Sequence, residues 1–236
     1  MRTASGVCVV VACVSSAMGQ LNNPGFETGT ASPGLPLFPV GAWAFDNHAF
    51  VTAENGITPA GGARMLKFLN SSPNSSASSL VTCDVLQIVD LTGGPWSALI
   101  ATGTAVANGT VLVNRVPQNA AGTVDTSFGL RLWSFSSLVD AQSLSNPTAT
   151  VQTPLVNSDN NPQTWEAIGA SLALPVGTQY LAFYLYASEN SLNEVTGTLE
   201  YHGHYADEAD LRIVPSPGAL ALVAAGGLVG LRRRRE

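Results

Sequence analysis

Between residues 20 and 213, short apolar stretches alternate with clusters of Gly, Pro, Asn and Ser. The stretches are rich in β-branched and aromatic residues, which is typical of strands. None of them shows the 3.6-residue period of an amphipathic helix. We expect strands near residues 42–46, 63–69, 80–89, 97–106, 110–116, 126–135, 148–152, 165–174, 179–187, 197–205 and 208–214. Many short strands separated by turn signals predict one all-β domain, an antiparallel β-sandwich.

The clearest alternation of apolar and polar positions runs through residues 180–187. Successive side chains of a strand point to opposite faces. One face of this strand should therefore carry Leu181, Phe183 and Leu185, and the other Tyr180, Tyr184 and Tyr186. We expect the leucine and phenylalanine face to meet the core.

The charge of the chain excludes one class of partner. Residues 20–215 hold five basic residues against fifteen acidic ones, although the whole chain has a net charge of −6. A protein that binds nucleic acid needs a basic face to neutralise phosphates. We therefore expect no nucleic-acid partner.

The two ends of the chain have patterns that differ from the middle. Residues 1–19 begin with Arg2, continue with an apolar run and end in small residues, which predicts a secretory signal peptide. A lipoprotein signal ending at Cys13 is the alternative. Residues 217–231 carry no charge and precede Arg232, Arg233, Arg234 and Arg235. This apolar segment is shorter than the ~20 residues of a full membrane span, and the arginines would stay in the cytoplasm.

The tail resembles a PEP-CTERM sorting signal, in which a Pro-Glu-Pro motif precedes an apolar helix and an arginine cluster. Here the motif consists of Pro215, Ser216 and Pro217, so serine replaces the glutamate. The resemblance implies export and processing by an exosortase-type membrane enzyme, in organisms that make extracellular polysaccharide. The alternative is an ordinary C-terminal membrane anchor. The chain thus divides into a signal peptide at 1–19, a sandwich at 20–213 and a sorting tail at 214–236.

The middle of the chain resembles the galactose-binding-domain-like jelly roll of many carbohydrate-binding modules. Three segments carry the resemblance: residues 21–27 at the start, residues 165–187 with their Pro-x-Gly-Thr turn, and residues 205–211 at the end. The resemblance implies that the first and last strands lie side by side. It also implies one structural Ca²⁺ there, held by Glu27 and Asp207 with Glu208 in reserve. The alternative is that these acids are solvated or cap turns.

Aromatic and basic residues on two expected strands could form a sugar-binding platform. Tyr184 and Tyr186 share one face, and Arg131 and Trp133 alternate together on another strand. Aromatic rings combine an apolar face with a polar tip, which suits the surface of a sugar. The alternative is ordinary packing, since strands favour aromatic residues in any case. We assign Trp43, Trp96 and Trp165 to the core.

Other candidate chemistry is weaker. His202 and His204 would share a strand face, but zinc sites need three or four ligands and few others are at hand. Cys83 is the only cysteine after residue 19 and reads as a small buried residue. The chain has no nucleophile elbow, His-Glu-x-x-His, phosphate loop or dinucleotide fingerprint.

The sequence as a whole predicts an exported, non-enzymatic protein of the cell surface or extracellular matrix. Its sandwich would bind polysaccharide, and its tail would bring it to the membrane and to an exosortase-like enzyme. A purely structural matrix protein without glycan binding is the main alternative. A glycosidase is the third, because a pair of catalytic acids has no local spacing rule.

Overall fold

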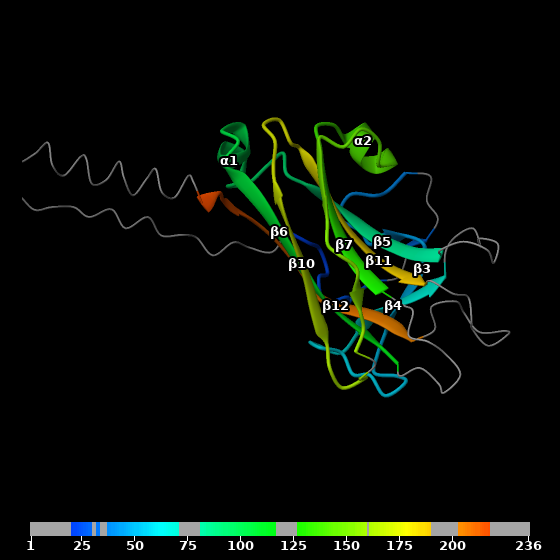
Figure 1. Ribbon diagram of the computed structural model, residues 1–236. Helices are drawn as coiled ribbons and strands as arrows, with labels where there is room; N and C mark the ends of the chain where they lie inside the picture. The colour runs from blue at the N-terminus through cyan, green and yellow to red at the C-terminus, as the bar shows by residue number, and fades with distance from the viewer. Residues whose placement is uncertain are drawn as a thin grey trace, which may run out of the picture.

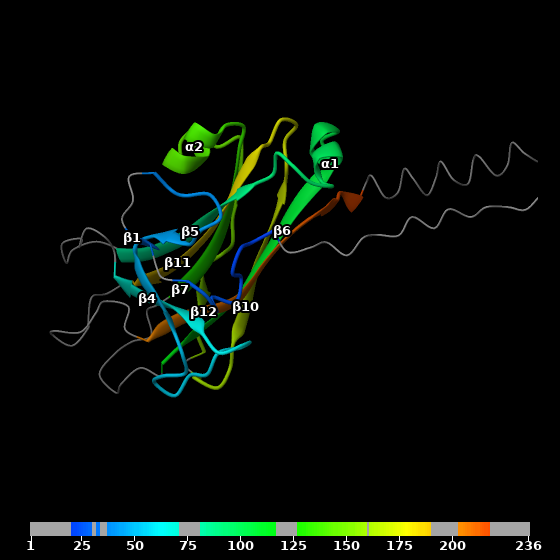
Figure 2. The same cartoon turned by 180° about the vertical axis from the view of Figure 1, so that it is seen from behind.

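The protein folds as a β-sandwich of two facing sheets (Figures 1 and 2). This computed structural model describes residues 20–29, 32–33, 37–70, 81–116, 127–159, 161–189 and 203–217. The first sheet has the order β1-β2-β5-β11-β7-β8, and β9 also pairs with β7. Its strands are β1 (Ser32–Pro33), β2 (Ala44–Phe45), β5 (Val81–Asp90), β7 (Ser127–Phe135), β8 (Ala149–Gln152), β9 (Val156–Asn157) and β11 (Tyr180–Glu189).

The second sheet has five strands in the order β10-β6-β12-β4-β3. They are β3 (Asn47–Val51), β4 (Met65–Asn70), β6 (Ala105–Arg115), β10 (Glu166–Ala173) and β12 (His204–Pro215). Apart from the parallel pair of β1 and β2, the strand pairs in both sheets are antiparallel. The prediction of an all-β sandwich is confirmed.

The alternation along β11 explains how the two sheets pack. Leu181, Phe183 and Leu185 are buried in the main core, which also contains apolar residues of β6, β10 and β12 from the facing sheet. Tyr184 and Tyr186 belong to a second apolar cluster on the outer face of the seven-stranded sheet. Each face of β11 therefore meets a different environment, as the sequence predicts.

Two short helices depart from the expected pattern. The strand expected over 97–106 is wrong for its first half, where α1 (Ser97–Ala101) forms instead. Alanine and leucine favour a helix, and Gly103 takes a left-handed conformation with φ of +66° just beyond its end. The second helix, α2 (Leu138–Ser143), begins where the Ser137 side chain accepts a hydrogen bond from the Asp140 backbone N–H. The sequence interpretation missed α2.

The last strand has other boundaries than the sequence predicts. The strands expected over 197–205 and 208–214 meet in the single strand β12, with a register shift between Asp207 and Asp210. Glu208 has a φ of +49° there, which is typical of a bulge. The start of the first expected strand, at residues 197–202, lies outside the described residues.

The chain crosses from one sheet to the other at Asp46. This residue stands between β2 of the seven-stranded sheet and β3 of the five-stranded sheet. Its backbone N–H donates to the Asp84 carbonyl at 2.9 Å, and its carboxylate accepts the Asp84 N–H at 2.8 Å. These bonds tie the crossing point to β5.

The beginning of the body lies beside its last strand. The Gln20 N–H donates to the Leu211 carbonyl, and the Ala209 N–H donates to the Pro24 carbonyl, both at 3.0 Å. The segment at 20–27 is not itself a strand. The expected proximity of the first and last segments is nevertheless confirmed.

The predicted signal peptide at 1–19 and residues 218–236 of the predicted tail, including the four arginines, lie outside the described residues. Among the residues that are described, no helix has the length and apolar character needed to cross a membrane.

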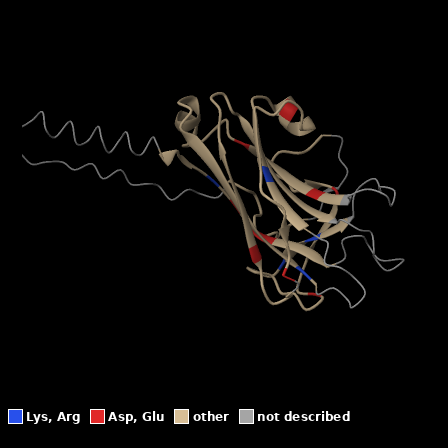
Figure 3. Cartoon of the chain, viewed as in Figure 1, with Lys and Arg blue, Asp and Glu red and all other residues tan. Residues whose placement is uncertain are grey.

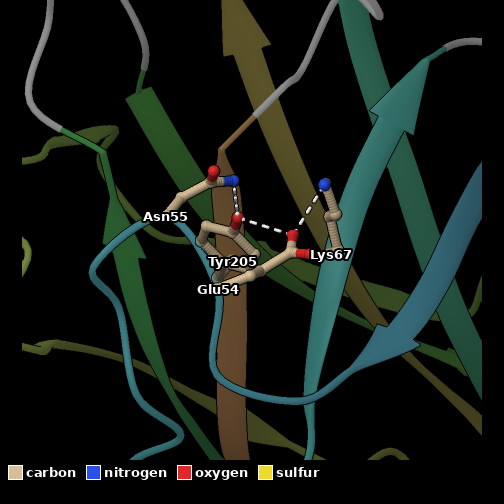
Figure 4. A network of polar contacts seen from close by, with 4 residues as sticks. All are labelled: Glu54, Asn55, Lys67 and Tyr205. Atoms are coloured by element: carbon tan, nitrogen blue, oxygen red, sulfur yellow. Dashed lines mark hydrogen bonds and ion pairs between the residues drawn. The ribbon is translucent and has the colours of Figure 1, made fainter.

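A polar network holds a loop on the outer face of the five-stranded sheet (Figure 4). Lys67 on β4 and Tyr205 on β12 are cross-strand neighbours. The Glu54 carboxylate accepts hydrogen bonds from the Lys67 ammonium group at 2.6 Å and from the Tyr205 hydroxyl at 2.8 Å. The Asn55 amide donates to the same hydroxyl at 2.8 Å. The network fixes the loop at residues 54–55 to two strands.

We predict that Tyr205→Phe destabilises the protein by about 1–2 kcal/mol, because it removes a fully buried hydroxyl with two partners. The matched control is Tyr180→Phe. Tyr180 is partly buried, and its side chain forms no hydrogen bond with the rest of the described chain. Removing its hydroxyl should therefore lower the free energy of unfolding by less than about 0.5 kcal/mol. Urea unfolding measures both variants. Equal effects would contradict a stabilising role for the network.

Candidate functional site

The register of the seven-stranded sheet places a polar and aromatic cluster on its outer face. Arg131 on β7 lies directly opposite Tyr184 on β11 and, on its other side, opposite Gln152 on β8. One row further along the sheet, Tyr186 lies opposite Asp84 on β5. Four strands that are distant in sequence thus bring these side chains together.

Arg131 lies over both tyrosine rings. Its guanidinium carbon is 5.2 Å from the centre of the Tyr184 ring and 4.2 Å from that of Tyr186. The Arg131 Nε–H donates to the Gln152 side-chain oxygen at 2.9 Å. The Gln152 amide in turn donates to the Tyr186 hydroxyl at 2.7 Å. These contacts hold the guanidinium group in place.

Trp133 extends the aromatic surface beside Arg131. Its ring centre lies 5.5 Å from that of Tyr184, with an angle of 31° between the planes. Tyr184 and Tyr186 are only 5% and 3% exposed, whereas Trp133 and Arg131 are partly exposed and Gln152 is exposed. Solvent therefore meets Trp133, Arg131 and Gln152, and the tyrosines form the layer beneath them. All four residues of the predicted platform lie together, with the two tyrosines largely covered.

A glycine makes room for the lower layer. Gly129 lies opposite Tyr186 across β7 and β11. A Cβ atom at Gly129 would fall 2.2 Å from Cζ of the Tyr186 ring, so a side chain there would displace the ring. The residues around Gly129 in the sequence do not show that glycine is needed there. Only the pairing of β7 with β11 shows that the Tyr186 ring lies over this position.

Asp84 adds a buried acid next to the tyrosines. It is 9% exposed, and one of its oxygens accepts a hydrogen bond from the Thr82 hydroxyl at 3.0 Å. It also interacts electrostatically with Tyr184. Burial raises the pKa of the Asp84 carboxyl, and the hydrogen bond from Thr82 and the Arg131 charge oppose that rise. Burial likewise raises the pKa of the Tyr184 hydroxyl, which stays protonated.

The three acids predicted as calcium ligands meet at another place, around the loop at residues 60–64. One Asp207 oxygen accepts backbone N–H bonds from Ala60 and Gly61 at 2.8 and 3.2 Å. The Glu27 carboxylate accepts the Ala63 N–H at 2.9 Å and the Arg64 N–H at 3.1 Å.

The third acid reaches the same loop. The Glu208 carboxylate packs on Gly61, since a Cβ atom there would fall 1.9 Å from its Oε1. Acids from both ends of the body thus converge on one loop.

Burial raises the pKa of the Asp207 carboxyl to about 6, although its backbone hydrogen bonds act in the opposite direction. The folded protein therefore holds this proton more tightly than the unfolded chain. The resulting stabilisation is fully present below the ordinary value of 3.8 and is lost as the pH rises through about 6. At neutral pH Asp207 is a buried carboxylate without a neutralising cation, which is the chemistry of a calcium ligand.

The carboxylate oxygens are already partly occupied by backbone N–H groups. In the described part of the chain, no group of three or more His, Cys, Asp or Glu side chains is arranged to hold a metal. The calcium site stays a prediction. Carboxylates and the carbonyls of the loop suit the ion chemically, and the side chains would have to turn toward it.

The histidine, cysteine and tryptophan residues named from the sequence lie against other residues of the sandwich where the structure describes them. His204 is buried with its ring centre 6.0 Å from that of Phe128, and His202 lies outside the described residues. Cys83 is buried, with its sulfur 3.5 Å from the Asn47 carbonyl oxygen. Trp43 is in the core, whereas Trp96 and Trp165 are only partly buried against apolar clusters.

A separate surface cavity of about 400 Å³ lies between α1 and the turn before β11. Ser97, Ile100 and Val176 are among the residues that line it, and none of its lining residues is charged. Its polar lining consists of the hydroxyl and amide side chains of Thr92, Ser97, Thr178 and Gln179.

Charged residues are sparse and scattered over the described part of the sandwich, and they form no basic face (Figure 3).

Comparisons with known proteins give similarities of structure only. No protein-family model matches the sequence, and no curated protein matches it either. TmCBM61 in complex with β-1,4-galactotriose is 15% identical over 85% of this chain and 100% of its own, with a TM-score of 0.42. The CBM22-1 xylan-binding domain of Xyn10C from Paenibacillus barcinonensis is 12% identical over 85% and 97%, with a TM-score of 0.44.

The C-terminal family 22 carbohydrate binding module of Xyn10B from Clostridium thermocellum is 13% identical over 74% of this chain and 87% of its own, with a TM-score of 0.38. The structural neighbours thus include carbohydrate-binding domains. At these TM-scores and identities, the similarities neither assign the chain to a family nor transfer a ligand to it.

Proposed function

We propose that this protein is a non-catalytic polysaccharide-binding protein of the cell surface or extracellular matrix. The outer face of the seven-stranded sheet, defined by Trp133, Arg131 and Gln152 above Tyr184 and Tyr186, is its binding surface. The observation that carries the proposal is this cluster, in which an aromatic ring lies beside fixed hydrogen-bonding groups at the surface.

The chemistry of the cluster suits a sugar. The C–H face of a pyranose ring packs on an aromatic ring, and its hydroxyl groups need donors and acceptors at the rim. Trp133 supplies the ring, and Gln152 and Arg131 supply the polar groups. The stacked tyrosines and the Gln152 bonds fix these groups before a ligand arrives, which reduces the entropy lost on binding.

We predict that Trp133→Ala weakens binding to any recognised polysaccharide at least tenfold, because it removes the partly exposed ring on which the sugar would pack. The matched control is Trp165→Ala, which removes a partly buried tryptophan whose indole N–H donates to the Thr58 carbonyl, away from the outer face. It should lower stability and leave binding unchanged. A glycan array with the purified full chain finds the polymer, and calorimetry compares the variants. If the wild type binds no polysaccharide, the proposal fails.

A structural matrix protein without glycan binding is the second candidate. The burial of Tyr184 and Tyr186 favours it, because ordinary packing would also cover these rings. The two candidates differ at Trp133: a structural role predicts a loss of stability in Trp133→Ala, whereas a binding role predicts a loss of affinity.

The proposal includes a structural calcium ion at the chain ends, with Glu27, Asp207 and Glu208 as its carboxylate ligands. Three acids converge on one loop, and Asp207 carries a buried charge at neutral pH. A bound cation would neutralise them and fasten residues 20–27 to β12.

We predict that excess CaCl₂ raises the melting temperature by about 5 °C at pH 7.5, because the ion binds only the folded state. The rise should be smaller at pH 5, where protons compete for Asp207. Asp207→Asn keeps an acceptor for the backbone N–H groups and should abolish the rise. Asp90→Asn, which changes an exposed acid, should retain it. A melting temperature that does not respond to calcium at pH 7.5 would rule out the ion.

The proposal also assigns the tail to an exosortase-type sorting system. The Pro-Ser-Pro motif lies where the last strand ends: Pro215 is opposite Ala105, and the Ser216 N–H donates to the Thr104 carbonyl at 2.7 Å. A processing enzyme would therefore meet the motif directly at the edge of the folded domain.

We predict that the mature protein at the cell surface lacks Arg232, Arg233, Arg234 and Arg235, because processing at or near residues 215–217 removes them. Intact-mass measurement of the protein released from the surface tests this, with the same protein from the cytoplasmic fraction as the control. A surface form that retains the four arginines would leave an ordinary membrane anchor instead.

A further inference from the structure

Arg131 is a partly buried cation whose closest contacts are neutral. The ion pairs in the described part of the chain are Lys67 with Glu54 and Arg212 with Asp210, and neither includes Arg131. Its guanidinium group instead contacts two tyrosine rings and an amide oxygen. Removing a charge from water is costly unless an opposite charge or hydrogen bonds compensate. The outer face therefore carries a positive charge without a bound counter-charge.

Asp84 does not supply that counter-charge. It attracts Arg131 electrostatically, but no nitrogen of Arg131 lies within 4.0 Å of its carboxylate, so the two form no ion pair. The register explains the separation, since Asp84 stands on β5 and Arg131 on β7, with the tyrosines of β11 between them.

The Arg131 guanidinium group has N–H donors that remain available to a ligand. It has five N–H groups, and the Nε–H is used by Gln152. Its planar fork matches a carboxylate, with which it forms two parallel hydrogen bonds. The rings beneath and the amide beside it hold the fork in one orientation, at the part of the cluster that solvent reaches.

We infer that the outer face selects acidic polysaccharides, in which Arg131 binds the carboxylate of a uronic acid while Trp133 packs against the sugar ring. The inference rests on the proposed function and specifies its ligand class. It commits to a carboxylate because the guanidinium fork recognises a planar anion.

The acidic character of the body does not prevent such binding. Fifteen acids against five bases in residues 20–215 would repel a polyanion at long range. At physiological ionic strength, charges more than ~8 Å apart are largely screened. A direct pair with a partly buried arginine is screened much less, so the local contact determines the preference.

The test uses two polymers that differ only in charge. Polygalacturonate and its highly methyl-esterified form share one backbone, and esterification removes the carboxylate charge. We expect the full-length protein to bind polygalacturonate at least tenfold more tightly than the ester, measured by calorimetry or affinity electrophoresis. Alginate provides a second uronic acid polymer, and dextran sulfate provides a non-planar anion that should bind at least tenfold more weakly than polygalacturonate.

Substitutions assign the preference to Arg131. Arg131→Gln should abolish the preference, so that polygalacturonate and the ester bind with similar affinity. Arg131→Lys keeps the charge without the fork and should lose most of the preference, which also covers the case that the glutamine variant does not fold. Trp133→Ala should weaken binding of both polymers.

The outcomes separate this inference from the proposed function. Equal binding of charged and neutral polysaccharides would overturn the inference and leave the polysaccharide-binding function standing. Equal binding of polygalacturonate and dextran sulfate would overturn the carboxylate assignment. If neither charged nor neutral polysaccharides bind, both the proposed function and the inference fail.

Discussion

Strand β11 is buried on both of its faces, and the rest of the structure depends on this constraint. It lies between β5 and β7 inside the seven-stranded sheet, with its aliphatic and phenylalanine residues in the core. Its outer face carries tyrosines, whose hydroxyl groups need partners when they are buried. Gln152 on β8 donates to the Tyr186 hydroxyl, and Asp84 on β5 interacts electrostatically with Tyr184. The burial of β11 on both faces thus brings polar side chains of the neighbouring strands against its tyrosines.

A second constraint acts at the ends of the chain. Residues 20–27 add no strand to either sheet, yet they lie along β12 through backbone hydrogen bonds. The carboxylates of Glu27 and Asp207 accept N–H groups of the same loop, so acids replace ladder hydrogen bonds in closing the sandwich. This closure buries the Asp207 carboxyl, and burial raises the pKa of that group. The closure and the candidate calcium site are the same feature.

The sequence predicted what depends on local pattern. The alternation in residues 180–187 gave the correct faces of β11, and the turn-rich spacing gave the sandwich. Helix α2 was missed although Ser137 and Asp140 form a recognisable helix start, because the helix is too short to show a period.

Features that depend on long-range register were not accessible from the sequence. Gln152 and Asp84 join the site only because β8 and β5 flank the strands that carry Arg131 and the tyrosines. The crossing at Asp46 was missed for a similar reason. A strand that changes sheets keeps its extended pattern, and only its partners, Asp84 on one side and β4 on the other, reveal the change.

The last strand of the body and the candidate binding surface belong to different sheets of the sandwich. Asp207, Glu208 and Pro215 belong to β12 of the five-stranded sheet, whereas Arg131 and Trp133 lie on the outer face of the other sheet. The core lies between the two. A protein held through the residues that follow β12 is therefore held from the end of a strand in the five-stranded sheet, whereas the candidate binding surface lies on the other sheet. The proposed attachment and the proposed contact with a polysaccharide therefore use different sheets of the sandwich, with the core between them.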